Sequence, residues 1–183
     1  GMALRGSITG GPASAATRSA SASACWVGLN PAAPAYFLTA GHCVSLDPWI
    51  VVRDRAVSYT VTLNYFTDTR NAFVGLRGVR VAWSTMKGTD LALIELNATN
   101  GEMQSRGLTP HKLGAVTSRN LYWTGAPTSF IPTGQAYLRR GACESQGMTT
   151  VIEGRWNWFD QIRNDCPDVY ASASGSPLFD AST

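Results

Sequence analysis

The sequence predicts an all-β protein, and three observations lead to this fold class. Short apolar or alternating runs recur from Cys25 onward, each bounded by turn-forming residues. Many of these runs are rich in β-branched and aromatic side chains, which strands favour. No long segment keeps the 3.6-residue periodicity of an amphipathic helix, so little helix is expected. The expected strands cover residues 35–39, 49–53, 59–65, 79–83, 91–96, 120–124 and 149–153.

The chain divides into an N-terminal segment and two expected lobes. Residues 1–24 are dominated by small residues, a composition that predicts flexible chain. Residues 25–111 form the first expected lobe and residues 112–183 the second, joined by a polar, Gly- and Pro-containing stretch at 97–118. A length of 183 residues with 44% hydrophobic content is sufficient for two small lobes that share an interface.

Composition argues against several classes of function. The net charge of +3 is spread along the chain without a basic and aromatic stripe, so a nucleic-acid partner is not expected. No apolar run approaches the roughly 20 residues of a membrane span. The four cysteines lack a C-x-x-C spacing, which favours disulfides in an oxidising compartment over a zinc site. We therefore expect a secreted protein whose export signal has been removed.

Two histidines are present, and their settings differ. His42 follows an apolar run and a small-residue turn and directly precedes Cys43. A strand end can hold an imidazole rigidly, as a general base requires. Considered alone, His42 would be better explained as a structural histidine bonded to the backbone. His111 follows Pro110 in loop-like sequence, which predicts a solvated surface residue.

A carboxylate and a hydroxyl are candidate partners for His42. Asp90 begins a strongly apolar run, where it either accepts backbone N–H groups of a turn or orients an imidazole. Ser174 lies in a small-residue turn that would let a substrate carbonyl approach and aim N–H groups at a developing oxyanion. Considered alone, Ser174 fits an ordinary loop before a final strand.

Taken together, three segments resemble the motifs of the chymotrypsin-like serine peptidases. They read TAGHC at 39–43, DLAL at 90–93 and SASGSP at 172–177, in the chain order of that family. Residues 36–43 and ITGG at 8–11 are most similar to the bacterial streptogrisin and α-lytic group, whereas SGSP at 174–177 is similar to the bacterial glutamyl and lysyl endopeptidases. The resemblance implies two six-stranded antiparallel β-barrels with the active site between them.

The resemblance also implies a role for each candidate residue. His42 would be the general base, Asp90 the group that orients it, and Ser174 the nucleophile of a secreted serine endopeptidase that cleaves proteins or peptides. No metal or cofactor is required. The backbone N–H groups of Ser172 and Ser174 would form the oxyanion hole, although Ser172 stands where the family has glycine.

Specificity and cross-links follow from the same resemblance. Asp168 falls at the base of the S1 pocket of trypsin-like members, which implies a preference for Arg or Lys at P1; the alternative is an exposed turn aspartate. Cys25 matches the family's partner of Cys43 beside the histidine. Cys143 and Cys166 would pair with each other if the chain is complete, but in this family a cysteine shortly before the serine often pairs with one further downstream.

Nine residues follow Ser174, whereas the family continues with the last strands of the second barrel. We therefore expect a truncated second barrel in one fragment of a nicked protein, whose C-terminal remainder is either held noncovalently as a partner of this chain or lost. The rival function is a pseudoprotease that acts as a binding module, which Ser172 and Ala173 favour because both depart from the family pattern. An esterase with the same acyl chemistry is a third possibility, but the α/β pattern of such hydrolases is missing.

Overall fold

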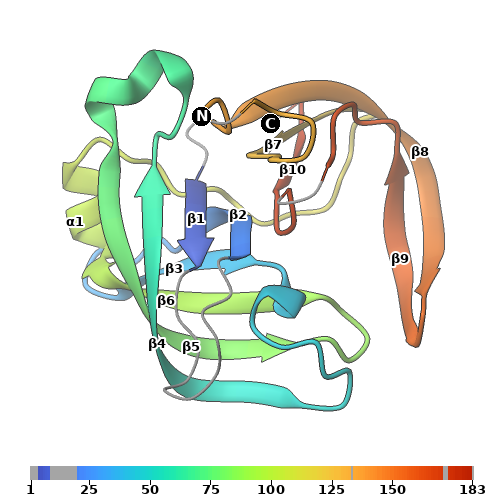
Figure 1. Cartoon of the computed structure of the whole chain (residues 1–183), viewed down its shortest axis with the longest axis horizontal. Coiled ribbons are helices and arrows are strands. Elements are labelled where there is room, and N and C mark those ends of the chain that lie inside the picture. Colours follow the sequence, from blue (N-terminus) through green and yellow to red (C-terminus); the bar gives the residue numbers. More distant parts are fainter. Residues whose placement is uncertain (1–3, 9–19, 133, 171–172, 183) are drawn as a thin grey trace.

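The structure is a computed structural model that describes residues 4–8, 20–132, 134–170 and 173–182, with side chains described from residue 24 onward (Figure 1). These residues form two β units and very little helix, which confirms the all-β fold class. The helical elements in the described chain are two 3-10 turns, η1 (Gly41–Cys43) and η2 (Thr67–Ala72), and the short helix α1 (Asn100–Ser105).

The first lobe is a closed antiparallel barrel with the strand order β1-β2-β3-β6-β5-β4. Closure depends on β1, which pairs with β2 on one side and β4 on the other. The strands are β1 (Leu4–Ile8), β2 (Ala20–Val27), β3 (Pro34–Thr39), β4 (Val51–Leu63), β5 (Val74–Thr85) and β6 (Leu91–Thr99).

The N-terminal segment differs in part from the flexible chain that its composition predicts. Residues 4–8 form β1, and residues 20–24 open β2. The small residues at 20–24 and the two large apolar residues of β1, Leu4 and Ile8, give only a weak hydrophobic signal, but the backbone of β1 pairs on both edges and forms the ladder hydrogen bonds that hold the strand. Residues 9–19 lie outside the described part of the chain.

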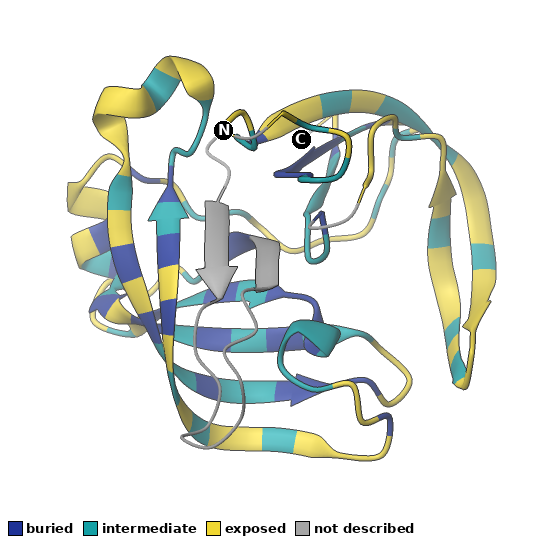
Figure 2. Cartoon of the chain, in the orientation of Figure 1, coloured by how far each residue is buried: buried dark blue, intermediate teal, exposed yellow. Residues whose placement is uncertain are grey.

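The barrel interior is filled by alternate residues of its strands (Figure 2). In β6, Ala92, Ile94 and Leu96 are buried, while the residues between them are only half-buried. This period-two alternation places one face of each strand in the core. Two aromatic residues, Trp26 and Phe37, belong to the same core cluster and contribute large buried areas. The barrel therefore provides a rigid support for the residues at its strand ends.

The second lobe is an open four-stranded sheet in the described residues, with the order β10-β7-β8-β9. Its outer strands, β9 and β10, each pair with one neighbour, in agreement with the expected incomplete barrel. Large apolar side chains of the β8–β9 hairpin are exposed, among them Met148, Ile152 and Phe159. The strands are β7 (Asn120–Gly125), β8 (Arg139–Glu153), β9 (Trp156–Asn164) and β10 (Leu178–Asp180).

The stretch between α1 and β7 connects the two lobes and contains the expected boundary at residues 111–112. A capping box begins α1, because Thr99 accepts from the Glu102 N–H and Glu102 accepts from the Thr99 N–H. A second connection joins the lobes directly, where the Leu138 N–H donates to the Tyr65 carbonyl at 2.9 Å. In the described part of the chain, no helix has the length and apolar character required to span a bilayer.

Candidate active site

His42 is held at the end of β3 by the turn η1, which packs closely on the barrel wall. A side chain at the preceding residue, Gly41, would place its Cβ 2.1 Å from the Thr85 carbonyl oxygen and 2.9 Å from the Leu91 nitrogen. Only glycine allows this approach of two backbones. Gly41 therefore fixes the position from which the His42 side chain leaves the barrel.

Asp90 immediately precedes β6 and binds His42 through both carboxylate oxygens. Oδ1 accepts the backbone N–H of His42 at 2.8 Å, and Oδ2 lies 2.7 Å from the ring nitrogen Nδ1. The pairing of β3 with β6, in which Thr39 is opposite Ala92, brings the two residues together. The bidentate contact fixes the position and rotation of the imidazole. It also favours the tautomer in which Nδ1 carries the proton and donates it to Asp90.

The hydrogen bond to Asp90 raises the pKa of His42 above its ordinary value of 6.5, and the neighbouring Cys43 side chain raises it further. The bond stabilises the protonated ring, which outweighs the opposing effect of burial. The side chains are partly open to solvent, 34% for His42 and 24% for Asp90. The ring edge that carries Nε2 therefore remains available to a reacting group.

Ser174 is presented by a tight turn in the second lobe. The turn is closed by a hydrogen bond from the Ser176 N–H to the Ala173 carbonyl at 2.9 Å. Gly175 adopts a φ of 74°, a left-handed conformation that favours glycine at this position. The backbone N–H of Ser174 donates to no acceptor within the described part of the chain, so it is available to bind an incoming oxygen.

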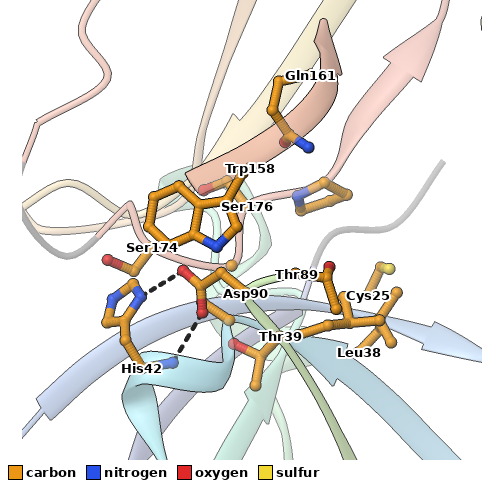
Figure 3. A pocket seen from close by; sticks show the side chains of 14 residues that line it. Cys25, Leu38, Thr39, His42, Thr89, Asp90, Trp158, Gln161, Ser174 and Ser176 are labelled. Atoms are coloured by element: carbon orange, nitrogen blue, oxygen red, sulfur yellow. Dashed lines mark hydrogen bonds and ion pairs between the residues drawn. The ribbon is translucent and has the colours of Figure 1, made fainter. Parts of the chain in front are cut away.

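The three candidates line one cavity of about 490 Å³ between the lobes. Figure 3 shows the His42 ring between the Asp90 carboxylate and the Ser174 hydroxyl. The structure contains no hydrogen bond between His42 and Ser174, both of which are described. Such bonds are often long before substrate binds. The fold thus brings together residues 132 positions apart in sequence, with the base and its carboxylate on one lobe and the hydroxyl on the other.

Sequence reasoning missed two residues of this cavity, Trp158 and Gln161. Both come from β9; in Figure 3, Trp158 lies over the Asp90 and Ser174 side chains, and Gln161 lies further along the strand. A Trp-Asn-Trp alternation at 156–158 was the available signal for a strand. Nothing in that alternation indicated that the hairpin approaches the first lobe.

Three other residues considered in the sequence, Ser172, Asp168 and His111, lie outside the cavity lining or outside the described residues. Ser172, the expected second oxyanion donor, lies outside the described residues. Asp168 is exposed, adopts a φ of 58°, and is absent from the cavity lining. Its setting matches the turn aspartate given as the alternative. His111 is half-buried instead of fully solvated, and its ring packs 4.6 Å from that of Phe179 because the linker crosses β10.

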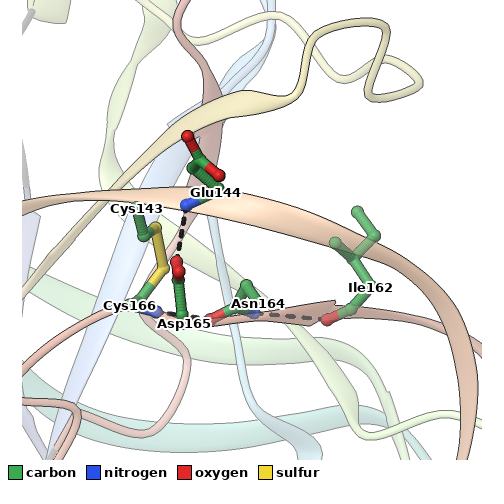
Figure 4. The surroundings of a disulfide bond; sticks show 6 residues. All are labelled: Cys143, Glu144, Ile162, Asn164, Asp165 and Cys166. Carbon is green, nitrogen blue, oxygen red and sulfur yellow. Dashed lines mark hydrogen bonds between the residues drawn. A yellow bond between two sulfur atoms is a disulfide. The ribbon is translucent and has the colours of Figure 1, made fainter.

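Cys143 and Cys166 form a disulfide, with Cα atoms 4.6 Å apart (Figure 4). This bond attaches the segment that precedes Ser174 to β8. The carboxylate of Asp165 reinforces the attachment by accepting the Glu144 N–H at 2.7 Å.

The expected bond between Cys25 and Cys43 is absent, and both thiols are free, which corrects that prediction. Cys43 packs against the barrel core, whereas Cys25 lies between the core residues Ala24 and Trp26 and lines the cavity. A disulfide instead requires Cβ atoms that face each other. Burial raises the pKa of Cys25 to about 11, so its thiol is a poor nucleophile at neutral pH.

Comparisons with known proteins agree with this geometry. A family model described as a trypsin-like peptidase domain matches residues 23–183. Among solved structures, the chain is similar to a thermostable serine protease, AL20, from an extremophilic microorganism, with 16% identity and a TM-score of 0.58. The alignment covers 97% of this chain and 77% of that chain, and it shows a shared fold. No curated protein sequence matches. Because the family model covers most of its length, the chain belongs to the trypsin-like peptidase domain family.

Proposed function

We propose that the chain is a serine endopeptidase with His42, Asp90 and Ser174 as its catalytic triad. One observation carries the proposal: Asp90 binds both the backbone N–H and the ring Nδ1 of His42 on the wall of a cavity that Ser174 also lines. A carboxylate in this position keeps the Nδ1 proton in place and leaves Nε2 free to accept a proton.

The first half-reaction forms an ester with Ser174. Its Oγ attacks the carbonyl carbon of the scissile peptide bond while His42 Nε2 accepts the Oγ proton, and the carbonyl electron pair moves to oxygen. The Ser174 N–H donates to this oxyanion, with the N–H of Ser172 as the proposed second donor. When the intermediate collapses, the C–N bond breaks and protonated His42 gives its proton to the leaving amine.

The second half-reaction releases the acid. Water attacks the ester carbon while His42 Nε2 accepts a water proton. The second tetrahedral intermediate then expels Ser174 Oγ, which takes that proton back. Throughout both steps, Asp90 stays ionised and stabilises the imidazolium. Proton transfer thus needs only groups that line the cavity between the lobes.

The proposed preference for Arg or Lys at P1 rests on Asp168 alone. Because this carboxylate is exposed and outside the cavity lining, contact with a P1 side chain would require the loop to move. A peptide-library cleavage profile of Asp168→Asn tests the preference. Loss of cleavage after Arg and Lys supports it, and an unchanged profile would assign Asp168 to the turn.

We propose an oxidising, extracytoplasmic location, which the Cys143–Cys166 disulfide supports. We also propose that further strands, in the expected C-terminal fragment, pair with the second lobe. Its outer strands β9 and β10 have one neighbour each in the described residues, and unpaired edges of this kind bind additional strands. Native mass spectrometry of the secreted material tests for the bound fragment.

Hydrolysis of casein tests the proposed activity. Wild type is expected to cleave it, Ser174→Ala to lose cleavage, and Ser105→Ala, a matched change on the exposed side of α1, to retain it. Cleavage by Ser174→Ala would contradict the assignment of the nucleophile. A folded wild type that binds casein without cleaving it would favour the pseudoprotease, and one that hydrolyses only esters would favour an esterase.

A further inference from the structure

A buried carboxylate lies a short distance beyond the Ser174 turn. Asp180 is the last residue of β10 and is 8% exposed. Its Oδ2 accepts three hydrogen bonds from the linker between the lobes: from Thr117 N at 2.7 Å, Thr117 Oγ1 at 2.8 Å and Ser118 N at 2.8 Å. A single oxygen thus holds two consecutive residues of the linker.

The other oxygen is also fully used. Oδ1 of Asp180 accepts the Ser182 N–H at 2.9 Å and the Ser182 hydroxyl at 2.6 Å. These bonds from Ser182, followed by those from Thr117, hold the pKa of Asp180 far below its ordinary range, because they stabilise the charged form. The cluster therefore persists over the whole pH range in which His42 can act as a base.

Asp180 joins three segments that set the position of the nucleophile. It lies on β10, which pairs with β7 through Asp180 opposite Leu121. At the start of β10, the Pro177 carbonyl accepts the Thr124 N–H at 3.3 Å, three residues after Ser174. The linker held by Asp180 is in turn bonded to the first lobe, where the His111 N–H donates to the Trp26 carbonyl at 3.0 Å.

The segment that carries Ser174 is therefore anchored at both ends. On its N-terminal side, the disulfide attaches Cys166 to β8. On its C-terminal side, the three-residue strand β10 offers few ladder hydrogen bonds, and Asp180 adds three bonds to the linker, while its two bonds from Ser182 are local. Without the carboxylate, the backbone N–H groups of Thr117 and Ser118 would lose their acceptor, and β10 would lose its attachment to the linker.

We propose that Asp180 is a positioning residue for the reaction: by fixing β10 to the linker, it holds Ser174 in register with His42 on the other lobe. The proposal rests on the triad proposed above. Asp180 itself does not line the cavity and contacts no reacting atom. Its effect is expected on the rate of acyl transfer, since small displacements of a nucleophile reduce the rate strongly.

The test compares Asp180→Ala and Asp180→Asn with wild type by p-nitrophenyl acetate hydrolysis and by the rate of Ser174 labelling with a fluorophosphonate. For Asp180→Ala we expect kcat and the labelling rate to fall by roughly 10- to 100-fold, with KM nearly unchanged. For Asp180→Asn we expect kcat and the labelling rate to lie between those of wild type and Asp180→Ala, because the one amide oxygen can keep the bonds to the linker. Thr117→Val removes one donor and is expected to lower kcat by a few-fold.

The matched control is Glu102→Ala. Glu102 also accepts a backbone N–H and a hydroxyl, both from Thr99, but at α1 in the first lobe. Its removal is expected to lower stability without lowering kcat. Equal losses of kcat in Glu102→Ala and Asp180→Ala would show that global destabilisation is the cause and would overturn the proposal.

Three further outcomes are decisive. Wild-type kcat and labelling in folded Asp180→Ala would overturn the positioning role while leaving the triad intact. If Asp180→Ala does not fold, a wild-type kcat in Thr117→Val overturns the role, and a reduced kcat at unchanged KM supports it. A wild-type protein that neither labels nor hydrolyses the ester would contradict the triad and the positioning role that depends on it.

Discussion

The two halves of the candidate site are built in different ways. His42 and Asp90 come from strand ends of a closed barrel, in which every strand has two neighbours, and the β3–β6 register within that barrel brings them together. Ser174 comes from a turn in an open sheet, where one disulfide and one carboxylate anchor the segment. The first half thus depends on the barrel as a whole, and the second depends on a few local bonds.

This comparison predicts where each half is most sensitive. In the barrel, a change must alter the approach of two strands or the contact between the two residues to disturb the site. In the open sheet, loss of a single cross-link is sufficient, because no closed ladder compensates for it.

The largest effect is expected from Asp90→Asn. The amide keeps the size of the side chain but removes the charge and the acceptor that fix the Nδ1 proton of His42. By analogy with other triads, kcat should fall by about 10⁴-fold. Casein hydrolysis measures the loss, and Asp47→Asn, which alters an exposed carboxylate bonded to the Trp49 N–H, is the control. A loss below tenfold would contradict the role of Asp90.

The next effect is expected from replacing Cys143 and Cys166 by serine. The disulfide closes a loop across a sequence separation of 23 residues, and its loss should lower the free energy of unfolding by about 3 kcal/mol. Urea unfolding measures this change. Labelling of Ser174 should slow under conditions in which the barrel is still folded, because the disulfide anchors a segment of the second lobe alone.

Replacing Cys25 and Cys43 by alanine is the matched control for that experiment. As both thiols are free, their loss should cost only the packing of two small side chains, about 1 kcal/mol each. A loss as large as that of the bonded pair would show that Cys25 and Cys43 are linked. Thiol alkylation of the denatured, unreduced protein gives the same answer, since two cysteines should react.

Gly41→Ala tests the barrel half. The added methyl group would meet the backbone of Thr85 at 2.1 Å, so η1 must shift and carry His42 with it. We expect a loss of about 1–3 kcal/mol in the free energy of unfolding together with slower labelling of Ser174. Gly114→Ala is the control, because its Cβ would have open space. Equal behaviour of the two variants would contradict the tight approach of η1 to the barrel.

The smallest effect concerns pH. The folded pKa of His42 is raised, so the stabilisation from its contact with Asp90 is fully present below pH 6.5 and is lost as pH rises through the folded pKa. Activity follows the opposite direction, since the base must be neutral. The acid limb of kcat/KM should lie above pH 6.5, and Asp90→Asn should shift it downward. The urea midpoint of unfolding should therefore fall as the pH is raised from 6 to 10. The same fall in Asp90→Asn would contradict this assignment.

Much of the barrel could be predicted from sequence because its strands alternate. The expected strand at 91–96 corresponds to β6, and the expected strand at 35–39 to β3. In contrast, β1 was not predicted, because its five residues contain only two large apolar side chains, Leu4 and Ile8, in a segment that is otherwise rich in small residues. The three-residue β10 is too short for such a pattern.

The site divides in the same way. His42 and Asp90 could be placed together from their motifs, because strand pairing in the barrel fixes their distance. Trp158 and Gln161 could not, since their position depends on how far the β8–β9 hairpin folds toward the first lobe. The role of Asp180 could not be predicted from sequence either, because its hydrogen-bond partners in the linker lie 62 and 63 residues away.

The central claim is that one reactive serine in the second lobe is activated by a histidine in the first. Labelling with a fluorophosphonate, followed by peptide mapping, tests it most directly. We expect a single adduct on Ser174 in wild type and its loss in His42→Ala, with Ser105 and Ser176 unmodified. An adduct on another residue, or equal labelling of Ser174 in His42→Ala, would contradict it.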